Sequence, residues 1–300
     1  MHWLKIFLVC ILVSLFFTSC ENKPSHPDTL STGAIDISVD ESYKPIIDEE
    51  LRVFDSCYPD AKIKIHYKPE NECIKDFFDS KSSLILVSRP LSKDENDACT
   101  KSNLYFTSLE LAGDAIAVIF NTKSEDSLLD MDALKGILTG VYKKKYKVVF
   151  DNQSSGTVRY VTDSILRGEK LGANVFAAKG NNDVIDYVEK NIDAIGFVGL
   201  SYICDNKDST KTGAFINRIK VASIKNDTLN EFYQPYQAYI ALKSYPLSRK
   251  LYYISREGYA GLATGFANFL GREQGQLIFA HSHLFPLRMN IVIREALIKK

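Results

Sequence analysis

The stretch Lys147-Val-Val-Phe-Asp-Asn-Gln-Ser-Ser-Gly-Thr-Val-Arg-Tyr-Val-Thr-Asp-Ser-Ile-Leu166 predicts a strand, a turn and a helix in succession. Turn residues follow the apolar run Val148 to Phe150, and apolar residues then recur at helical spacing. Ser155 is a candidate N-cap, and Gly156 lets a ligand approach the first helical N–H groups, which have no partner within the helix. These donors and the helix dipole favour an anion site, and an ordinary capped helix is the alternative.

The composition is that of a globular protein large enough for two lobes. The chain has 300 residues, of which 45% are hydrophobic and 25% are charged. Its 37 basic and 37 acidic residues give a formal net charge of +0. This balance argues against a polyanionic partner such as nucleic acid, so an anion site has to be local.

The N-terminus is predicted to be an export signal over residues 1–19. Lys5 is followed by an apolar run, Ile6 to Phe17, that is too short to span a membrane comfortably. Small residues before Cys20 resemble the lipobox of bacterial lipoproteins, with Phe17 where leucine is usual. This resemblance implies a lipid on Cys20, whereas a plain secretory signal and an uncleaved anchor are the alternatives. Residues 20–32 are polar and are expected to form a tether.

Similar strand-to-helix junctions recur along the chain. The strand Ala34 to Val39 precedes Asp40-Glu41-Ser42, where Ser42 is expected to cap the next helix, and a buried strand ends at Ser88-Arg89. Further on, Arg218 to Ile224 is predicted as one strand. Alternating strands and helices predict an α/β fold with parallel sheets, whose ligands bind at the carboxyl ends of the strands.

Short motifs that follow one another through most of the chain carry a family resemblance. They are Ser88-Arg-Pro-Leu-Ser92, Leu134-Lys-Gly-Ile-Leu-Thr-Gly140, Ser154-Ser-Gly-Thr157, Lys179-Gly-Asn-Asn-Asp183, Ala194-Ile-Gly-Phe-Val198, Tyr245-Pro-Leu247 and Gln274-Gly-Gln276. Their order resembles the phosphate-binding proteins of high-affinity phosphate ABC transporters, which have the type II periplasmic-binding-protein fold.

The resemblance implies a monomer with two lobes and two crossing strands as the hinge. With crossings near Ala115 to Asn121 and Gln237 to Leu242, lobe I comprises residues 33–117 and 240–300 and lobe II comprises 118–239. The implied function is to bind inorganic phosphate between the lobes, without a cofactor, and to deliver it to ABC permease subunits. The protein is then exported and attached by its lipid to the periplasmic face of a membrane or to the cell surface.

The resemblance also implies which residues bind the anion. In lobe II these are Ser155, Gly156 and Thr157, with Asn152 and Ser154 beside them, and in lobe I they are Asp40, Glu41, Ser42, Ser88 and Arg89. Arg159, one turn into the helix, is a candidate charge partner or a solvent-facing arginine.

One departure from the family affects the charge of the site. Many members have an arginine four residues before this serine and an aspartate two before it, but here Asp151 and Gln153 occupy those positions. Arg89 or Arg159 would therefore have to supply the positive charge.

A carboxylate in the site can accept the proton of hydrogen phosphate, which sulfate lacks. Asp40 is the first candidate for this acceptor, and Glu41 and Asp151 are the second. Each is equally compatible with a solvated turn.

Other functions have weaker support. No Gly-x-Ser-x-Gly motif surrounds the serines, and His281-Ser-His283 has no accompanying metal ligands, so neither an enzyme nor a metal site is expected. Cys57, Cys73, Cys99 and Cys204 predict one or two disulfides, or else buried free thiols. The remaining alternatives are a binding protein for another oxyanion or a small organic ligand, and a surface adhesin or signalling lipoprotein on the same fold.

Overall fold

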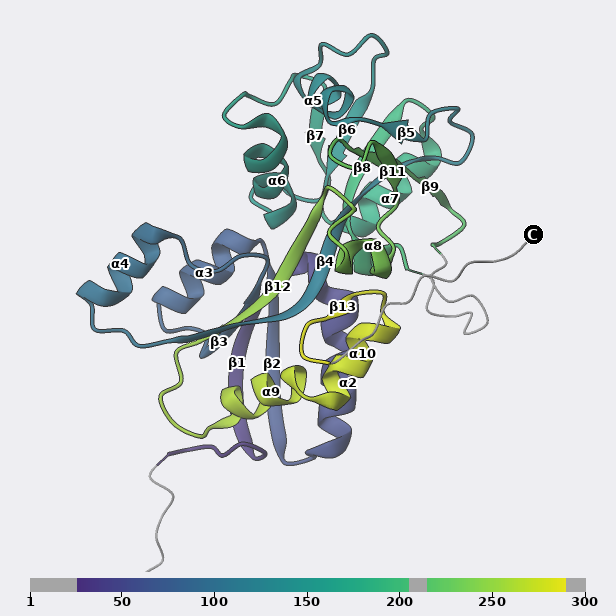
Figure 1. Ribbon diagram of the computed structural model, residues 1–300. Coiled ribbons are helices and arrows are strands. Elements are labelled where there is room, and N and C mark those ends of the chain that lie inside the picture. The colour runs from purple at the N-terminus through teal and green to yellow at the C-terminus, as the bar shows by residue number, and fades with distance from the viewer. Residues whose placement is uncertain (1–25, 205–214, 290–300) are drawn as a thin grey trace, which may run out of the picture.

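The structure is a computed structural model that describes residues 26–204 and 215–289. The predicted signal and Cys20 lie outside the described residues. One long sheet runs through both halves of the molecule in the order β2-β1-β3-β12-β4-β8-β6-β7, and β9 and β13 also pair with β4 (Figure 1). A smaller sheet has the order β11-β10-β5.

The strands are β1 (Gly33–Asp40), β2 (Ala61–Lys68), β3 (Leu84–Val87), β4 (Thr107–Asn121), β5 (Leu128–Leu129), β6 (Lys147–Phe150), β7 (Val175–Ala177), β8 (Ala194–Gly199), β9 (Ile219–Val221), β10 (Ser223–Asn226), β11 (Glu231–Tyr233), β12 (Ser248–Ser255) and β13 (Phe285–Pro286). The helices are α2 (Lys44–Cys57), α3 (Glu70–Phe78), α4 (Lys93–Lys101), α5 (Met131–Thr139), α6 (Gly156–Val161), α7 (Asn181–Lys190), α8 (Gln237–Ala241), α9 (Leu262–Gly271) and α10 (Glu273–His281). No helix among them is long and apolar enough to span a membrane.

Lobe I is built on β1, β2 and β3, which are parallel to one another, and on the antiparallel strand β12. On one face, α2 and α9 pack together with α10, and the rings of Phe54 and Phe266 lie edge to face at 5.1 Å. On the other face, Phe77 of α3 and Cys99 of α4 belong to a separate buried cluster. Buried side chains on both faces explain why β3 is apolar at every position.

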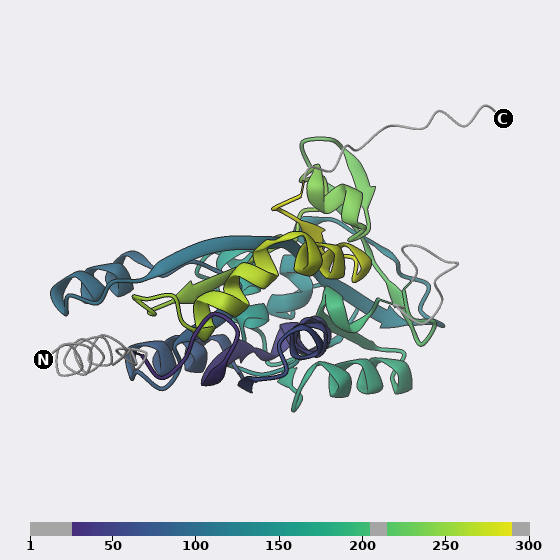
Figure 2. The same ribbon diagram turned by 90° about the horizontal axis from the view of Figure 1, so that it is seen from below.

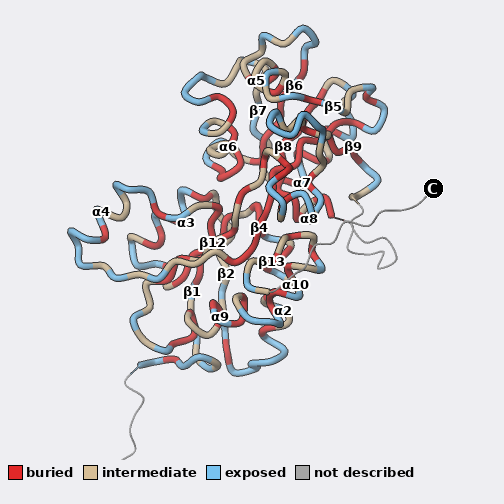
Figure 3. Tube along the Cα trace, viewed as in Figure 1, coloured by how far each residue is buried: buried red, intermediate tan, exposed pale blue. Residues whose placement is uncertain are grey.

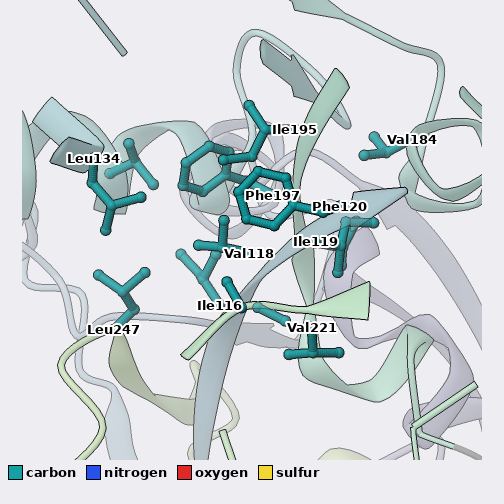
Figure 4. Close-up of a cluster of buried hydrophobic side chains, with 14 of the residues drawn as sticks. Ile116, Val118, Ile119, Phe120, Leu134, Val184, Ile195, Phe197, Val221 and Leu247 are labelled. Atoms are coloured by element: carbon teal, nitrogen blue, oxygen red, sulfur yellow. The ribbon is translucent and has the colours of Figure 1, made fainter. Parts of the chain in front are cut away.

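Lobe II is built on β8, β6 and β7, which are parallel, and on the antiparallel second half of β4. Its core contains Val118, Ile195 and Phe197 from the sheet and Leu134 and Val184 from the helices (Figure 4). Two buried aromatic residues of this core, Phe150 and Phe197, stack with their ring centroids 4.8 Å apart.

The strand β4 connects the lobes. Its first half pairs with β12 as far as Ala115, and its second half pairs with β8 from Ile116 onward. Figure 2 shows it as a long band that continues from one lobe into the other, and Figure 3 shows that its middle is buried. This agrees with the predicted first crossing near Ala115 to Asn121.

The predicted second crossing strand over Gln237 to Leu242 is wrong, because this segment is the helix α8. The chain crosses further on: Leu247 belongs to the core of lobe II, whereas Leu251 belongs to that of lobe I. The Ile116 N–H donates to the carbonyl of Leu247 at 3.0 Å, which joins the two crossing segments. Five residues are too few for periodicity to separate a helix from a strand.

Two smaller predictions also need correction. The segment Arg218 to Ile224 is not one strand, because β9 pairs with β4 while β10 pairs with β5 and β11 in the smaller sheet. Ser42 does not cap α2, whose N-cap is Tyr43.

The four cysteines of the described residues, Cys57, Cys73, Cys99 and Cys204, form no disulfide.

Candidate anion-binding site

Loops from both lobes meet at Gly156, the first residue of α6. A Cβ atom added to Gly156 would lie 2.5 Å from Oδ2 of Asp40, 3.0 Å from Oγ of Ser88 and 3.1 Å from Oε2 of Glu70. These three lobe I residues follow or end β1, β3 and β2. Only glycine allows the backbone of lobe II to approach these carboxylates so closely. The strand-end loops that the sequence singled out are therefore brought together.

Asp40 presents one carboxylate oxygen to this meeting point. Its Oδ1 accepts hydrogen bonds from the N–H of Ser42 at 2.9 Å and from the Ser42 hydroxyl at 2.8 Å, so Asp40 caps the short 3-10 turn Glu41–Tyr43. Its Oδ2 is buried and has no hydrogen-bond partner among the described residues. Burial, together with the charge of Glu70, raises the pKa of Asp40 to about 7.

The cap of α6 forms as predicted. The Ser155 hydroxyl accepts a hydrogen bond from the N–H of Val158 at 3.2 Å and donates to Oδ1 of Asp151 at 2.6 Å. Asp151 also accepts from the N–H of Asn152 at 2.9 Å and from Nδ2 of Asn181 at 3.2 Å. Asp151 therefore stabilises the loop before α6 in its own lobe, and most of the hydrogen-bonding positions of its carboxylate are occupied.

Thr157, in the first turn of α6, and Ser154, in the loop before this helix, have different surroundings. The Thr157 hydroxyl is buried and has no hydrogen-bond partner in the described part of the chain. A buried polar atom without a partner is costly, so this hydroxyl is well placed to bind a ligand. Ser154 is exposed, and its N–H donates to Oδ1 of Asn152 at 2.9 Å, within the turn.

Both arginines predicted from the sequence are held by carboxylates. Arg89 donates from Nη1 and Nη2 to Glu95 at 2.7 and 2.9 Å. Arg159, on α6 of lobe II, donates from Nε to Oε1 of Glu70 at 2.5 Å and from Nη2 to the Ser88 hydroxyl at 3.0 Å. Arg159 thus reaches across to lobe I rather than into solvent, and α6 lies next to α3 (Figure 1).

Glu70 is a site residue that sequence reasoning missed. It is fully buried at the start of α3 and accepts hydrogen bonds from both the N–H, at 2.9 Å, and the hydroxyl of Ser88. Burial opposes its ionisation, but the charges of Arg159 and Arg89 and the hydrogen bonds from Arg159 and Ser88 together outweigh this effect and hold the pKa of Glu70 below its usual value. Its position in the sequence could have indicated this role. Glu70 comes just after the carboxyl end of β2, and Asp40 is the last residue of the neighbouring parallel strand β1.

Arg249 is the second missed residue. It lies on β12 and donates from Nε to Oδ2 of Asp114 at 2.7 Å and from Nη2 to the Ser42 hydroxyl at 3.0 Å. Both side chains of the Arg249–Asp114 pair are 1% exposed. The only sequence signal was its place two residues after the Tyr245-Pro-Leu247 motif.

Lobe II also holds the Asp40–Ser42 loop from the side. The Tyr202 hydroxyl donates to the carbonyl of Glu41 at 2.9 Å, and the Ser201 hydroxyl donates to the carbonyl of Ser42 at 3.0 Å. Burial and the charge of Asp151 raise the pKa of Glu41 to about 7, and its Oε1 is buried without a partner among the described residues. Within the described ranges, no group of three acidic, histidine or cysteine side chains could hold a metal ion.

The sequence matches the family described as "PBP superfamily domain" over residues 24–273. The chain belongs to the PBP superfamily. The predicted resemblance is thereby confirmed at the level of the superfamily, and the lobes and crossing segments confirm the predicted type II fold.

Curated relatives in the PBP superfamily include protein SphX of Synechococcus elongatus, 26% identical over 179 residues that cover 54% of this chain. The phosphate-binding protein PstS of Staphylococcus aureus is 25% identical over 221 residues that cover 69% of this chain. The matches span 53% and 64% of the lengths of these two relatives.

A solved structure with the same fold is the putative phosphate ABC transporter substrate-binding protein of Clostridium perfringens with bound phosphate. Its TM-score is 0.71 at 24% identity, and the match covers 85% of this chain and 100% of that chain. At this identity the match supports the fold of the superfamily and does not by itself assign a ligand.

Proposed function

We propose that this member of the PBP superfamily binds inorganic phosphate between its two lobes. The observation that carries the proposal is the close approach of Gly156 in lobe II to Asp40 and Ser88 in lobe I. The hydroxyl of the next residue, Thr157, is buried and has no partner among the described residues. An enclosed phosphate needs donors on several sides, and hydroxyls and N–H groups from two lobes meet this need. The names of the S. aureus relative and of the C. perfringens structure support the same ligand.

Asp40 gives the proposed site a way to distinguish phosphate from sulfate. A buried carboxylate can accept a hydrogen bond from a protonated phosphate oxygen, but it repels sulfate, which has no proton to donate. The groups that act on the charge of Asp40 are Glu70, Asp151, Arg249 and Ser42. Because the pKa of Asp40 is about 7, it is a carboxylate above this pH and can donate its own proton below it.

The affinity ratio of phosphate to sulfate should therefore increase with pH. Between about pH 6 and about pH 8.5 we expect calorimetry to show an increase of roughly 10-fold or more, which corresponds to the loss of one hydrogen bond to a charged group. An Asp40→Asn variant should show a clearly smaller increase of this ratio, because its amide does not titrate, whereas phosphate itself and Glu41, whose pKa is also raised to about 7, still change charge in this range. Equal affinities for the two anions at every pH would contradict the role of Asp40, and the absence of phosphate binding would contradict the proposed function.

We further propose that the protein is an exported lipoprotein that delivers phosphate to an ABC permease. The apolar run before Cys20 supports export, and membership of the PBP superfamily supports a role in delivery. In this proposal the predicted bounds, residues 33–117 and 240–300 for lobe I and 118–239 for lobe II, are adjusted to the later second crossing, so that lobe II extends to Leu247 and lobe I resumes by Leu251.

Mass spectrometry of the membrane-extracted protein should find a mature N-terminus at Cys20 that carries acyl chains. A Cys20→Ser variant should lose this modification, because the serine hydroxyl does not replace the thiol to which the lipid is attached. Cys57→Ser is the matched control, since Cys57 is an exposed free cysteine and its removal should leave the lipid in place. A mature N-terminus at any other residue would contradict the lipid anchor.

A further inference from the structure

Two arginines between the lobes, Arg89 and Arg159, are the first candidates for the positive charge of the site. Arg89 uses both of its terminal nitrogens on Glu95, and Arg159 is paired with Glu70. Each of these guanidinium groups is therefore neutralised by a carboxylate and oriented by it. The loop before α6 adds no cation, since Asp151 stands at the position where a charge partner was expected.

Arg249 is also paired with a carboxylate, Asp114, but it differs from Arg89 and Arg159 in having a buried nitrogen that is left without a partner among the described residues. Its Nε and Nη2 are bound to Asp114 and Ser42, whereas its Nη1 is buried and has no partner in the part of the chain that the structure describes. A buried guanidinium nitrogen without an acceptor is destabilising, and an anion supplied from outside would satisfy it.

A chain of contacts connects Arg249 to the meeting point of the lobes. The Ser42 hydroxyl that accepts from Arg249 donates to Oδ1 of Asp40, and the free Oδ2 of Asp40 faces Gly156. From lobe II, a Cβ atom added to Gly199 would lie 3.5 Å from Nη2 of Arg249. The guanidinium is therefore connected to the meeting point of the lobes through Ser42 and Asp40, and it also lies close to Gly199 of lobe II.

The position of Arg249 in the fold keeps this cation fixed. Arg249 on β12 is the direct register partner of Asp114 on β4, within the two segments that cross between the lobes. The guanidinium carbon lies 5.1 Å from the centroid of the Tyr43 ring, and this cation–π contact also holds the guanidinium in place. A charge held in this way binds an anion without having to be reorganised.

We propose that Arg249 is the residue whose guanidinium binds the anion in the cleft, through Nη1. This inference rests on the proposed function and names the cation of that site. Arg159 and Arg89 then have other roles: Arg159 links the lobes through Glu70, and Arg89 holds the turn after β3.

Substitution of Arg249 tests the proposal with inorganic phosphate as the probe. Arg249→Lys keeps a positive charge beside Asp114 but loses the planar guanidinium with its several N–H donors. We expect calorimetry to show roughly 10-fold weaker binding of phosphate. Removing Arg249 alone would leave Asp114 buried and unpaired, so the second variant is the double substitution Arg249→Gln with Asp114→Asn, expected to bind roughly 100-fold more weakly.

The neighbouring ion pair on the same two strands provides a matched control. Nζ of Lys250 lies 2.7 Å from Oε1 of Glu110, and both side chains are about two-fifths exposed. The double variant Lys250→Gln with Glu110→Gln should keep wild-type affinity for phosphate, because this pair contributes little in water.

A spectroscopic measurement on the wild-type protein separates binding from a structural role. In a protein labelled with ¹⁵N-arginine, phosphate should shift the side-chain resonances of Arg249, which the Arg249→Lys spectrum identifies. Unshifted Arg249 resonances in a protein that binds phosphate would overturn the proposal, and so would wild-type affinity in a folded Arg249→Gln/Asp114→Asn variant. Failure of the wild-type protein to bind phosphate would instead overturn the proposed function.

Discussion

A Gly156→Ala variant is expected to bind phosphate roughly 10- to 100-fold more weakly than the wild-type protein, as overpacking of a close contact costs about 1–3 kcal/mol. The added methyl group would lie 2.5 Å from Oδ2 of Asp40. Asp40 cannot turn away easily, because Ser42 holds its other oxygen with two hydrogen bonds. The methyl group would therefore keep the lobes apart, although alanine itself suits the first turn of a helix.

This variant also tests whether closure of the lobes encloses the ligand. Small-angle scattering of the wild-type protein should show a smaller radius of gyration with saturating phosphate than without it, as hinge closure implies. In Gly156→Ala this decrease should be reduced or absent, while the thermal midpoint without ligand stays close to that of the wild type.

Gly180→Ala is the matched control. Gly180 lies, like Gly156, at the start of a helix of lobe II, as the N-cap of α7, and no atom lies within 4 Å of a Cβ added there. It should keep both the affinity and the change in scattering. Wild-type affinity in Gly156→Ala would show that the approach of Gly156 to Asp40 is not needed for binding. Identical scattering profiles of the wild-type protein with and without phosphate would instead contradict closure of the lobes around the ligand.

The second large effect concerns Glu50, which is fully buried on α2 in lobe I. Neither of its carboxylate oxygens has a hydrogen-bond partner among the described residues. Burial, with a smaller effect of Glu49, raises its pKa from 4.5 to about 10. Folding therefore requires Glu50 to bind a proton that the unfolded chain releases above about pH 4.5.

The stability cost of Glu50 follows from this difference in pKa. It is absent below the unfolded-state pKa, grows as pH rises, and reaches its full value near the folded-state pKa. Glu50→Gln, which needs no proton, should therefore raise the free energy of unfolding by about 3 kcal/mol at pH 7. Below about pH 4 the variant and the wild type should be equally stable, because Glu50 is then protonated in both states.

Urea denaturation at about pH 4 and about pH 7 measures this difference. Glu49→Gln is the control on the same helix, since Glu49 forms an exposed ion pair with Arg52 and its loss should change stability little at either pH. A Glu50→Gln variant no more stable than the wild type at pH 7 would mean that Glu50 is ionised and has a partner in the folded protein.

Much of the fold could be predicted from the sequence because the signals involved are local. Strands such as β3 and β6 are short apolar runs, and the N-cap at Ser155 and the left-handed Gly140 after α5 depend only on nearby residues. The order of the short motifs, through the family resemblance that they carry, predicted a two-lobed type II fold. The same local signals placed Asp40, Ser88 and Gly156 at strand ends, where the structure brings them together.

Predictions that depended on more than local chemistry were less successful. Asp40 and Ser42 are both good caps, and only the packed loop shows that Asp40 accepts the hydrogen bonds while Ser42 donates to it. Similarly, the tyrosine-rich segment at α8 is compatible with a strand or a helix until its neighbours are known.

The amino-acid sequence by itself determined the α/β class, the strand-end loops and the serine-glycine-threonine turn of this protein. Only the tertiary structure decided which charges meet. Glu70 and Arg159 are 89 residues apart, and Asp114 and Arg249 are 135 apart. The physical reason is that a cap or an apolar period is set within a few residues, whereas an ion pair between distant residues depends on strand register and on the approach of two lobes.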